Sequence, residues 1–289
     1  MIFSDKKLAI SSLRIGVRAH DFGRASAEEL TARIAASGFS CVQLALNKAI
    51  AGLDLRAGDL TADLARSIGG AFARQGVGIE VLGCYINPIH PDLQTRRALL
   101  EYFKDHLRFA REFGCRLVAL ESGSVNPDYL PHPDNHSDAA FGEMLKSLAE
   151  LVAEAEKCGV SVGLEAVTAH TVSSARKMRR VLDALGSKHL KVVFDPVNLL
   201  SVENASDQAR IIPEALEFLG DDIAVFHAKD FILENGAIKS VPAGCGKLDY
   251  APVLQFIRSQ KPDLAVLLEE TAPMVATRSA EFLQSQTQK

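Results

Sequence analysis

Short apolar segments alternate with longer amphipathic segments along almost the whole chain, and the alternation occurs eight times. The apolar segments are rich in Val, Ile and Leu and have the length of β-strands. The predicted strands are 13–17, 41–46, 78–85, 116–121, 160–165, 190–195, 223–227 and 264–269. The predicted helices lie near 26–37, 60–75, 92–113, 137–158, 171–185, 206–219, 249–260 and 274–285.

This order of elements predicts a closed barrel. Continuous apolar strands are typical of a sheet buried on both faces, and short strand–helix units favour parallel strands joined by right-handed crossovers. The helix ends agree, because Ser26 with Glu29 has the spacing of a capping box and glycines such as Gly38 and Gly159 follow helical segments. We therefore predict an α/β fold, a (β/α)8 TIM barrel, as a single domain over 1–289.

One long loop interrupts the regular alternation. Residues 122–137 include Pro127, Pro131 and Pro133 and follow the fourth predicted strand. Barrel enzymes build their sites from the loops that follow the strands. Both a lid or pocket wall and a passive insertion are compatible with this segment.

Polar side chains end five of the predicted strands. They are Glu121, Glu165, Asp195, His227, and the adjacent pair Glu269 and Glu270. In a barrel these side chains converge on one mouth. A single strand-terminal carboxylate commonly faces solvent, but several carboxylates in one mouth repel each other, and a divalent cation relieves that repulsion. Carboxylates with one imidazole suit Mn²⁺, Co²⁺, Mg²⁺ or Zn²⁺.

Four motifs at these strand ends carry a family resemblance. GLEAV at 163–167, VVFDPVN at 192–198, FHAKD at 226–230 and LLEE at 267–270 resemble motifs of the xylose-isomerase-like TIM barrel superfamily. That group includes sugar phosphate isomerases and epimerases, the tagatose and psicose 3-epimerases, and inosose dehydratases and isomerases. The likeness covers essentially the whole chain.

The resemblance implies that Glu165, Asp195, His227 and Glu269 are the metal ligands, and that Glu165 and Glu269 move protons. The chemistry agrees, since proton abstraction next to a carbonyl needs a base, an electrophile and a second acid/base group. Neighbouring strand residues point to opposite faces, so only one of Glu269 and Glu270 is expected to enter the mouth. We favour Glu269, which directly follows the apolar run, and keep Glu270 as the alternative.

Two positions depart from the ketose 3-epimerase pattern. Asn198 stands where those enzymes have a substrate-contacting histidine, and Leu233 stands where they have an arginine six residues after the metal-binding histidine. Both departures put free-ketohexose 3-epimerisation in doubt. Lys229 and Asp230 are candidates to replace the missing contacts, or form a salt-bridged loop pair. The expected substrate-binding residues are His20, Tyr85, Asn87, His90, Glu121, Asn198 and Lys229.

Composition narrows the classes of partner. The 32 Lys and Arg and 36 Asp and Glu are dispersed, with a net charge of −4, which disfavours nucleic acid. No apolar run reaches the roughly 18–20 residues of a membrane span, and residues 1–17 lack the pattern of a secretion signal. The five cysteines form no CxxC pair, and we expect free thiols in a reducing cytoplasm. A homo-oligomer is compatible with this sequence.

The leading hypothesis is a divalent-metal-dependent isomerase or epimerase of a sugar, keto-sugar or sugar phosphate. An inosose-type dehydratase is the main alternative, because it removes the same kind of proton and then expels a hydroxyl. An endonuclease IV-like nuclease requires three metals, further histidines and a basic surface. A non-catalytic sugar-binding barrel is a third class. No GxGxxG follows a predicted strand, so a nicotinamide cofactor is not expected.

Overall fold

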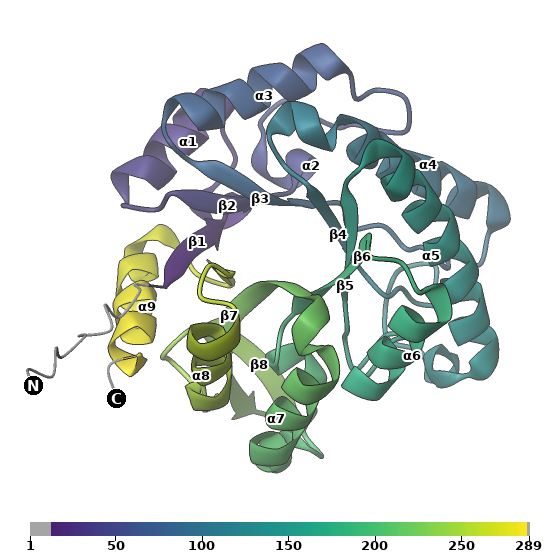
Figure 1. The fold of residues 1–289 in the computed structure, drawn as a ribbon, viewed down its shortest axis with the longest axis vertical. Coiled ribbons are helices and arrows are strands. Elements are labelled where there is room, and N and C mark those ends of the chain that lie inside the picture. The colour runs from purple at the N-terminus through teal and green to yellow at the C-terminus, as the bar shows by residue number, and fades with distance from the viewer. Residues whose placement is uncertain (1–12, 288–289) are drawn as a thin grey trace, which may run out of the picture.

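A closed eight-stranded parallel barrel forms the centre of the computed structural model, which describes residues 13–287 (Figure 1). The barrel strands are β1 (Arg14–Arg18), β2 (Cys41–Leu44), β3 (Gly78–Gly83), β4 (Leu117–Glu121), β5 (Ser161–Glu165), β6 (Leu190–Phe194), β7 (Ile223–Glu234) and β9 (Ala265–Leu268). Strands pair in chain order, and β9 pairs in parallel with both β7 and β1, which closes the ring. The predicted (β/α)8 barrel is confirmed.

Helices surround the barrel, one or more after nearly every strand (Figure 1). They are α1 (Ala27–Ala36), α2 (Leu46–Ala49), α3 (Ala62–Arg74), α4 (Leu93–Phe109), α5 (Asp138–Cys158), α6 (Ala175–Leu185), α7 (Gln208–Leu219), α8 (Ala251–Gln260) and α9 (Pro273–Gln286). The Ser26 side chain accepts a hydrogen bond from the Glu29 amide, which caps α1 as the capping spacing predicted. Within residues 13–287, none of the helices has the length and apolarity that a bilayer span requires. The expectation about a secretion signal concerns residues that lie mostly outside the described range.

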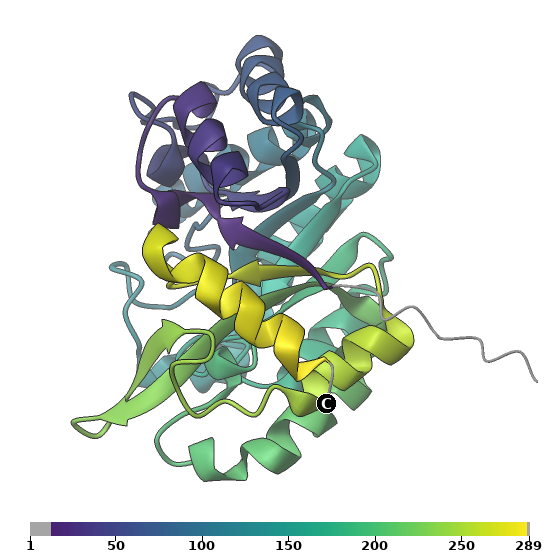
Figure 2. The same cartoon turned by 90° about the vertical axis from the view of Figure 1, so that its left-hand side faces the viewer.

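The seventh barrel strand is longer than the sequence pattern predicted. Instead of ending at 227, β7 continues to Glu234 and pairs antiparallel with β8 (Ala237–Pro242). Asn235 and Gly236 join the two strands, both with positive φ, which is the geometry that Asn-Gly hairpin turns favour. The resulting hairpin extends beyond the barrel wall (Figure 2). Leu233 lies on this hairpin and is 46% exposed.

Small and apolar side chains fill the barrel interior below the mouth, that is, on the side of the amino ends of the strands. Cys41, Val81, Ala119, Val193, Val225 and Leu267 are members of this inner cluster. At Gly16, an added Cβ would clash with the Cys41 backbone, so the interior is closed at that level. A ligand must therefore bind above this layer, at the mouth formed by the carboxyl ends of the strands.

Candidate functional site

The two-residue period of the strands places polar side chains directly above the apolar layer. Residues two positions after an inward-facing residue also face inward. Asp195 thus follows Val193, His227 follows Val225, and Glu269 follows Leu267. On β7 the next inward position is Lys229, because the strand continues past His227.

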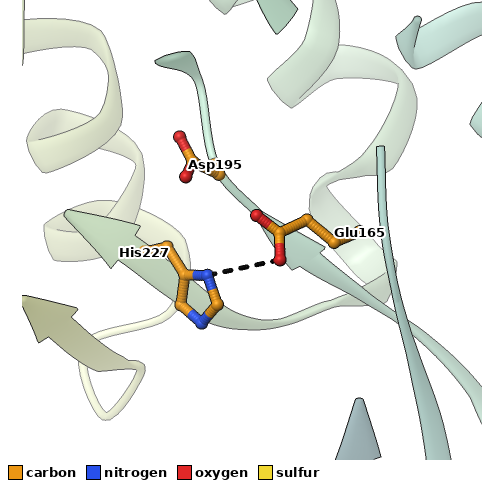
Figure 3. Close-up of side chains that lie close together, drawn as sticks. All are labelled: Glu165, Asp195 and His227. Carbon is orange, nitrogen blue, oxygen red and sulfur yellow. Dashed lines mark ion pairs between the residues drawn. The ribbon is translucent and has the colours of Figure 1, made fainter. Parts of the chain in front are cut away.

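Three of these side chains form a compact, buried cluster. One ligand atom each from Glu165, Asp195 and His227 lies within 4.8 Å of the other two (Figure 3). The Nδ1 atom of His227 is 3.5 Å from Oε2 of Glu165. All three residues are at most 4% exposed.

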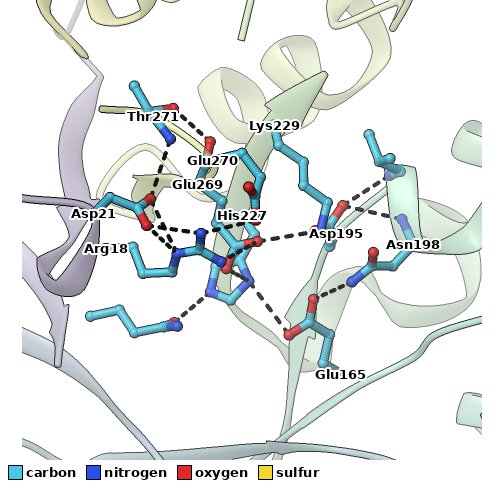
Figure 4. Close-up of polar contacts among 12 residues, drawn as sticks. Arg18, Asp21, Glu165, Asp195, Asn198, His227, Lys229, Glu269, Glu270 and Thr271 are labelled. Carbon is cyan, nitrogen blue, oxygen red and sulfur yellow. Dashed lines mark hydrogen bonds and ion pairs between the residues drawn. The ribbon is translucent and has the colours of Figure 1, made fainter. Parts of the chain in front are cut away.

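Glu269, the residue that directly follows β9, approaches the same cluster. Its Oε1 lies 3.2 Å from Nδ1 of His227. Its Oε2 lies 3.3 Å from the Lys229 ammonium, which is also 2.6 Å from Oδ2 of Asp195 (Figure 4). Lys229 therefore bridges the two carboxylates that flank the histidine.

The side chain of Glu270, the residue after Glu269, points away from the cluster. Glu270 has a φ of 52°, and its side chain is 48% exposed and pairs with Arg18 at 3.0 Å. Arg18 also pairs with Asp21 at 2.9 Å, and lies 3.8 Å from Glu269. Of the two adjacent glutamates, Glu269 is the one beside His227.

A buried glutamine orients the histidine ring. Nε2 of His227 lies 2.7 Å from Oε1 of Gln43, and the Gln43 amide group donates to the Tyr85 hydroxyl. Gln43 therefore accepts from His227, which leaves the hydrogen of a neutral imidazole on Nε2 and the lone pair on Nδ1. Nδ1 is buried without a hydrogen-bond partner and faces the carboxylates.

The charges of the cluster are compatible with a bound cation. Burial lowers the pKa of His227, but the Glu269 and Glu165 carboxylates outweigh burial and raise it to about 9. Burial raises the pKa of Glu269, yet His227, Lys229 and Arg18 together lower it to about 2. At that pKa the His227 ring carries a proton at neutral pH. If a metal ion took the place of the proton on Nδ1, the imidazole would be neutral, and the three carboxylates and the Lys229 ammonium would leave two negative charges. One divalent cation would neutralise them, and the unpartnered Nδ1 with nearby carboxylate oxygens fits such an ion.

Backbone and side-chain hydrogen bonds hold the carboxylates in place. Oδ1 of Asp195 accepts from the backbone N–H groups of Val197 at 2.9 Å and Asn198 at 3.3 Å. The Asn198 side chain donates to Oε1 of Glu165 at 2.7 Å. Asn198 lines the pocket as well as orienting Glu165.

A polar pocket of about 440 Å³ lies over the cluster. This volume suits a small molecule. Its walls are Arg18, Lys48, Tyr85, Glu121, Tyr129, Glu165, Val167, His170, Asn198, Lys229, Glu269 and Glu270. Of the expected substrate-binding residues, Tyr85, Glu121, Asn198 and Lys229 line this pocket.

Three expected substrate contacts lie outside the pocket lining. The Asn87 amide donates to the backbone carbonyls of Ser124 and Asn126, so it holds the 122–137 loop. His90 accepts from the Asp92 backbone at 3.2 Å near the start of α4. His20 is half-buried, and burial together with Arg18 and Lys48 lowers its pKa to about 4.

Three further polar residues at the site, Gln43, Tyr129 and His170, were not among the residues predicted from the sequence. Gln43 is a polar residue inside an apolar strand, which is a signal for an inward-facing functional side chain. Tyr129 and His170 belong to loops, where no periodicity indicates their direction.

Asp230, one of the two candidates for the missing substrate contacts, neither forms a salt bridge with Lys229 nor lines the pocket. Its carboxylate accepts hydrogen bonds from the backbone N–H groups of Leu248 at 2.7 Å and Gly244 at 3.2 Å.

Comparisons with known proteins agree on the architecture. The family model described as xylose isomerase-like TIM barrel matches residues 31–286. A solved structure of a D-tagatose 3-epimerase-like protein has 18% sequence identity and a TM-score of 0.74, with 96% of this chain and 97% of that chain covered. No curated protein matches this chain.

Two further structures share the fold. The IolI protein with a bound zinc atom has 14% identity and a TM-score of 0.71, with 95% and 98% covered. The probable 3-DHS dehydratase AsbF from Bacillus anthracis has 13% identity and a TM-score of 0.72, with 94% and 98% covered. At these identities the structures are alike in fold.

Proposed function

This chain belongs to the xylose isomerase-like TIM barrel family, and we propose that it is a divalent-metal-dependent isomerase or epimerase of a polyhydroxylated carbonyl compound. The observation that carries the proposal is the unpartnered Nδ1 of His227, which faces the Glu165 and Glu269 carboxylates at the barrel mouth. A non-catalytic barrel that only bound sugars would not require a buried histidine aimed at several carboxylates.

The proposed metal ligands are Glu165, Asp195, His227 through Nδ1, and Glu269. When bound, the cation would polarise a carbonyl oxygen and stabilise the negative charge that develops there after the neighbouring proton leaves. Mn²⁺, Co²⁺, Mg²⁺ and Zn²⁺ are all compatible with this donor set. The zinc atom in the IolI structure makes Zn²⁺ an early choice for testing.

Glu165 and Glu269 are the proposed proton-transfer pair. Glu165 is the last residue of β5 and Glu269 directly follows β9, and each presents one oxygen toward the Nδ1 atom of His227. Asn198 holds the second oxygen of Glu165, and Lys229 holds the second oxygen of Glu269. One glutamate would take the proton from the carbon next to the carbonyl, and the other would return a proton to the opposite face.

Lys229 is proposed to hydrogen-bond a substrate oxygen. Burial lowers the pKa of its ammonium group, but Asp195 and Glu269 outweigh burial and raise it, so the group stays charged. The side chain lines the pocket beside both carboxylates.

Dehydration is the second candidate reaction. It begins with the same proton abstraction and then needs an acid near the departing hydroxyl. Glu121 lines the pocket, and burial and the Glu165 carboxylate raise its pKa to about 7, so a protonated carboxyl group is available at neutral pH. The nuclease alternative has less support, because one carboxylate–histidine group of this kind occurs within residues 13–287.

The proposal is tested by turnover with defined metal content. The purified protein is stripped with a chelator, reloaded separately with Mn²⁺, Co²⁺, Mg²⁺ or Zn²⁺, and incubated with ketoses, inososes and sugar phosphates. We expect at least one metal to restore conversion of at least one compound, and NMR of the product separates epimerisation, isomerisation and dehydration. Equal turnover by stripped and reloaded protein would contradict metal dependence.

A further inference from the structure

Three pocket residues on the side away from Glu269 form a separate polar group, which we call the distal wall: Glu121, Tyr129 and His170. In the ring of eight strands, β4 lies four positions from β9, so Glu121 faces Glu269 across the mouth. Tyr129 comes from the 122–137 loop, and His170 comes from the loop between β5 and α6. The mechanism proposed above does not use Tyr129 or His170.

Two polar atoms of the distal wall are buried without a hydrogen-bond partner. They are the Tyr129 hydroxyl and Nδ1 of His170. Nδ1 of His170 lies 3.2 Å from Oε2 of Glu121, but not in the alignment of a hydrogen bond. The His170 side chain is 8% exposed, and the two rings pack with their centroids 4.8 Å apart. Buried polar groups are normally paired, so unpaired groups that line a pocket indicate a missing ligand.

Tyr129 also has an unfavourable backbone conformation. Its φ of 63° lies in the left-handed region, which bulky residues rarely adopt. A fully buried side chain, Asn135, stabilises the surrounding loop by accepting from the Val125 backbone at 2.8 Å and donating to the Ala169 carbonyl at 2.8 Å. The same hydrogen bonds connect the loop of Tyr129 with the loop of His170. Backbone strain maintained by such a network is typical of functional sites.

We propose that the distal wall is a second polar subsite, which binds an uncharged, hydroxyl-bearing end of the substrate. A hydroxyl group there would accept a hydrogen bond from the Tyr129 hydroxyl and donate one to Nδ1 of the neutral His170 ring, so both unsatisfied atoms would gain a partner. Burial and the Glu121 carboxylate raise the pKa of the Tyr129 phenol, so it remains a donor. This inference rests on the proposed function, in which the metal centre receives the carbonyl end.

The charges near the distal wall disfavour a phosphate or carboxylate on the substrate. The distal wall contains the acidic residue Glu121 and no Lys or Arg. Its histidine, His170, is neutral, because burial lowers its pKa to about 4. The pocket cations lie elsewhere, with Arg18 on β1, Lys48 on α2 and Lys229 on β7. An anionic end would instead be expected near one of these cations, for example Lys48, whose ammonium lies over the Tyr85 ring.

The test compares neutral sugars with their phosphates. Protein loaded with Mn²⁺ is titrated by calorimetry with D-fructose, D-tagatose, D-fructose 6-phosphate and D-tagatose 6-phosphate. We expect a neutral sugar to bind about tenfold or more tightly than its phosphate. We also expect Tyr129→Phe to weaken binding of the neutral sugar about fivefold, the effect of one hydrogen bond, without changing the Mn²⁺ affinity.

Tyr102→Phe is the matched control, because Tyr102 lies on α4 and does not line this pocket. Tighter binding of the phosphates, or equal binding of the neutral sugars by Tyr129→Phe and the parent protein, would overturn the distal-wall proposal alone. If Mn²⁺ binds but none of the four sugars does, the proposed function fails for ketoses and the distal-wall proposal fails with it.

Discussion

The imidazole of His227 donates from Nε2 to Oε1 of Gln43, which lies 2.7 Å away on the far side of the ring from the carboxylates. Gln43 is fully buried and is itself bonded to the Tyr85 hydroxyl. Because this contact keeps a hydrogen on Nε2, the neutral form of the ring presents its lone pair from Nδ1 toward Glu165 and Glu269.

Replacing Gln43 should therefore weaken metal binding without removing a ligand. We predict that Gln43→Leu lowers the affinity for Mn²⁺ by about 10- to 100-fold, as measured by calorimetry. Gln255→Leu, an exposed position on α8, is the matched control and should bind Mn²⁺ normally. An unchanged affinity in a folded Gln43→Leu protein would show that the contact does not orient the ligand.

Removal of a proposed metal ligand should lower the amount of metal bound per chain. Asp195→Ala and His227→Ala are each expected to lose bound metal in elemental analysis after gel filtration, because each removes one donor from a buried site. Circular dichroism checks that the variants fold. If both variants kept full occupancy, the metal would have to bind elsewhere.

Two adjacent glutamates permit a direct comparison of a buried and an exposed carboxylate. We predict that Glu165→Gln and Glu269→Gln reduce kcat by about 10² to 10⁴ or more, with a smaller change in KM, because each removes a proton-transfer group. Glu270→Gln should lower kcat much less than either, because Glu270 lines the pocket and pairs with Arg18 but is not one of the proposed proton-transfer groups. Metal content is measured in all three variants, and near-normal turnover in either buried variant with metal retained would exclude that glutamate from the mechanism.

The burial of His170 in the distal wall should make the free energy of unfolding depend on pH. Burial lowers the pKa of His170 to about 4 from 6.5, so the unfolded chain binds a proton that the folded protein does not. The contribution of His170 to folding stability is therefore lost as pH falls from about 6.5 toward 4. At pH 5 the loss is about 2 kcal/mol relative to pH 7.

Urea unfolding at pH 7 and pH 5 measures this effect. We predict that His170→Asn loses less stability over this interval than the parent protein, by up to about 2 kcal/mol. Titrations at the other histidines occur in both proteins and cancel in the difference. Parallel pH dependences would mean that His170 is not held neutral in the folded state.

The barrel could be predicted because its strands are buried on both faces and are therefore continuously apolar. The inward direction of Glu269 also follows from sequence, since Leu267 and Glu269 share one side of the strand. The β7–β8 hairpin was missed, although the Asn235-Gly236 turn is a recognised signal, because the apolar pattern weakens after His227. A local pattern could not place Tyr129 beside His170, since that contact depends on long-range hydrogen bonds made by Asn135.

Solvent isotope incorporation tests the central claim, glutamate-mediated proton transfer next to a carbonyl, most directly. Metal-loaded protein is incubated in D₂O with a compound that it converts, and the substrate and product are examined by proton NMR. We expect deuterium at the carbon next to the carbonyl, with labelling abolished or strongly slowed in Glu165→Gln and Glu269→Gln. Conversion without solvent deuterium would contradict it, because the hydrogen would then move within the substrate as a hydride.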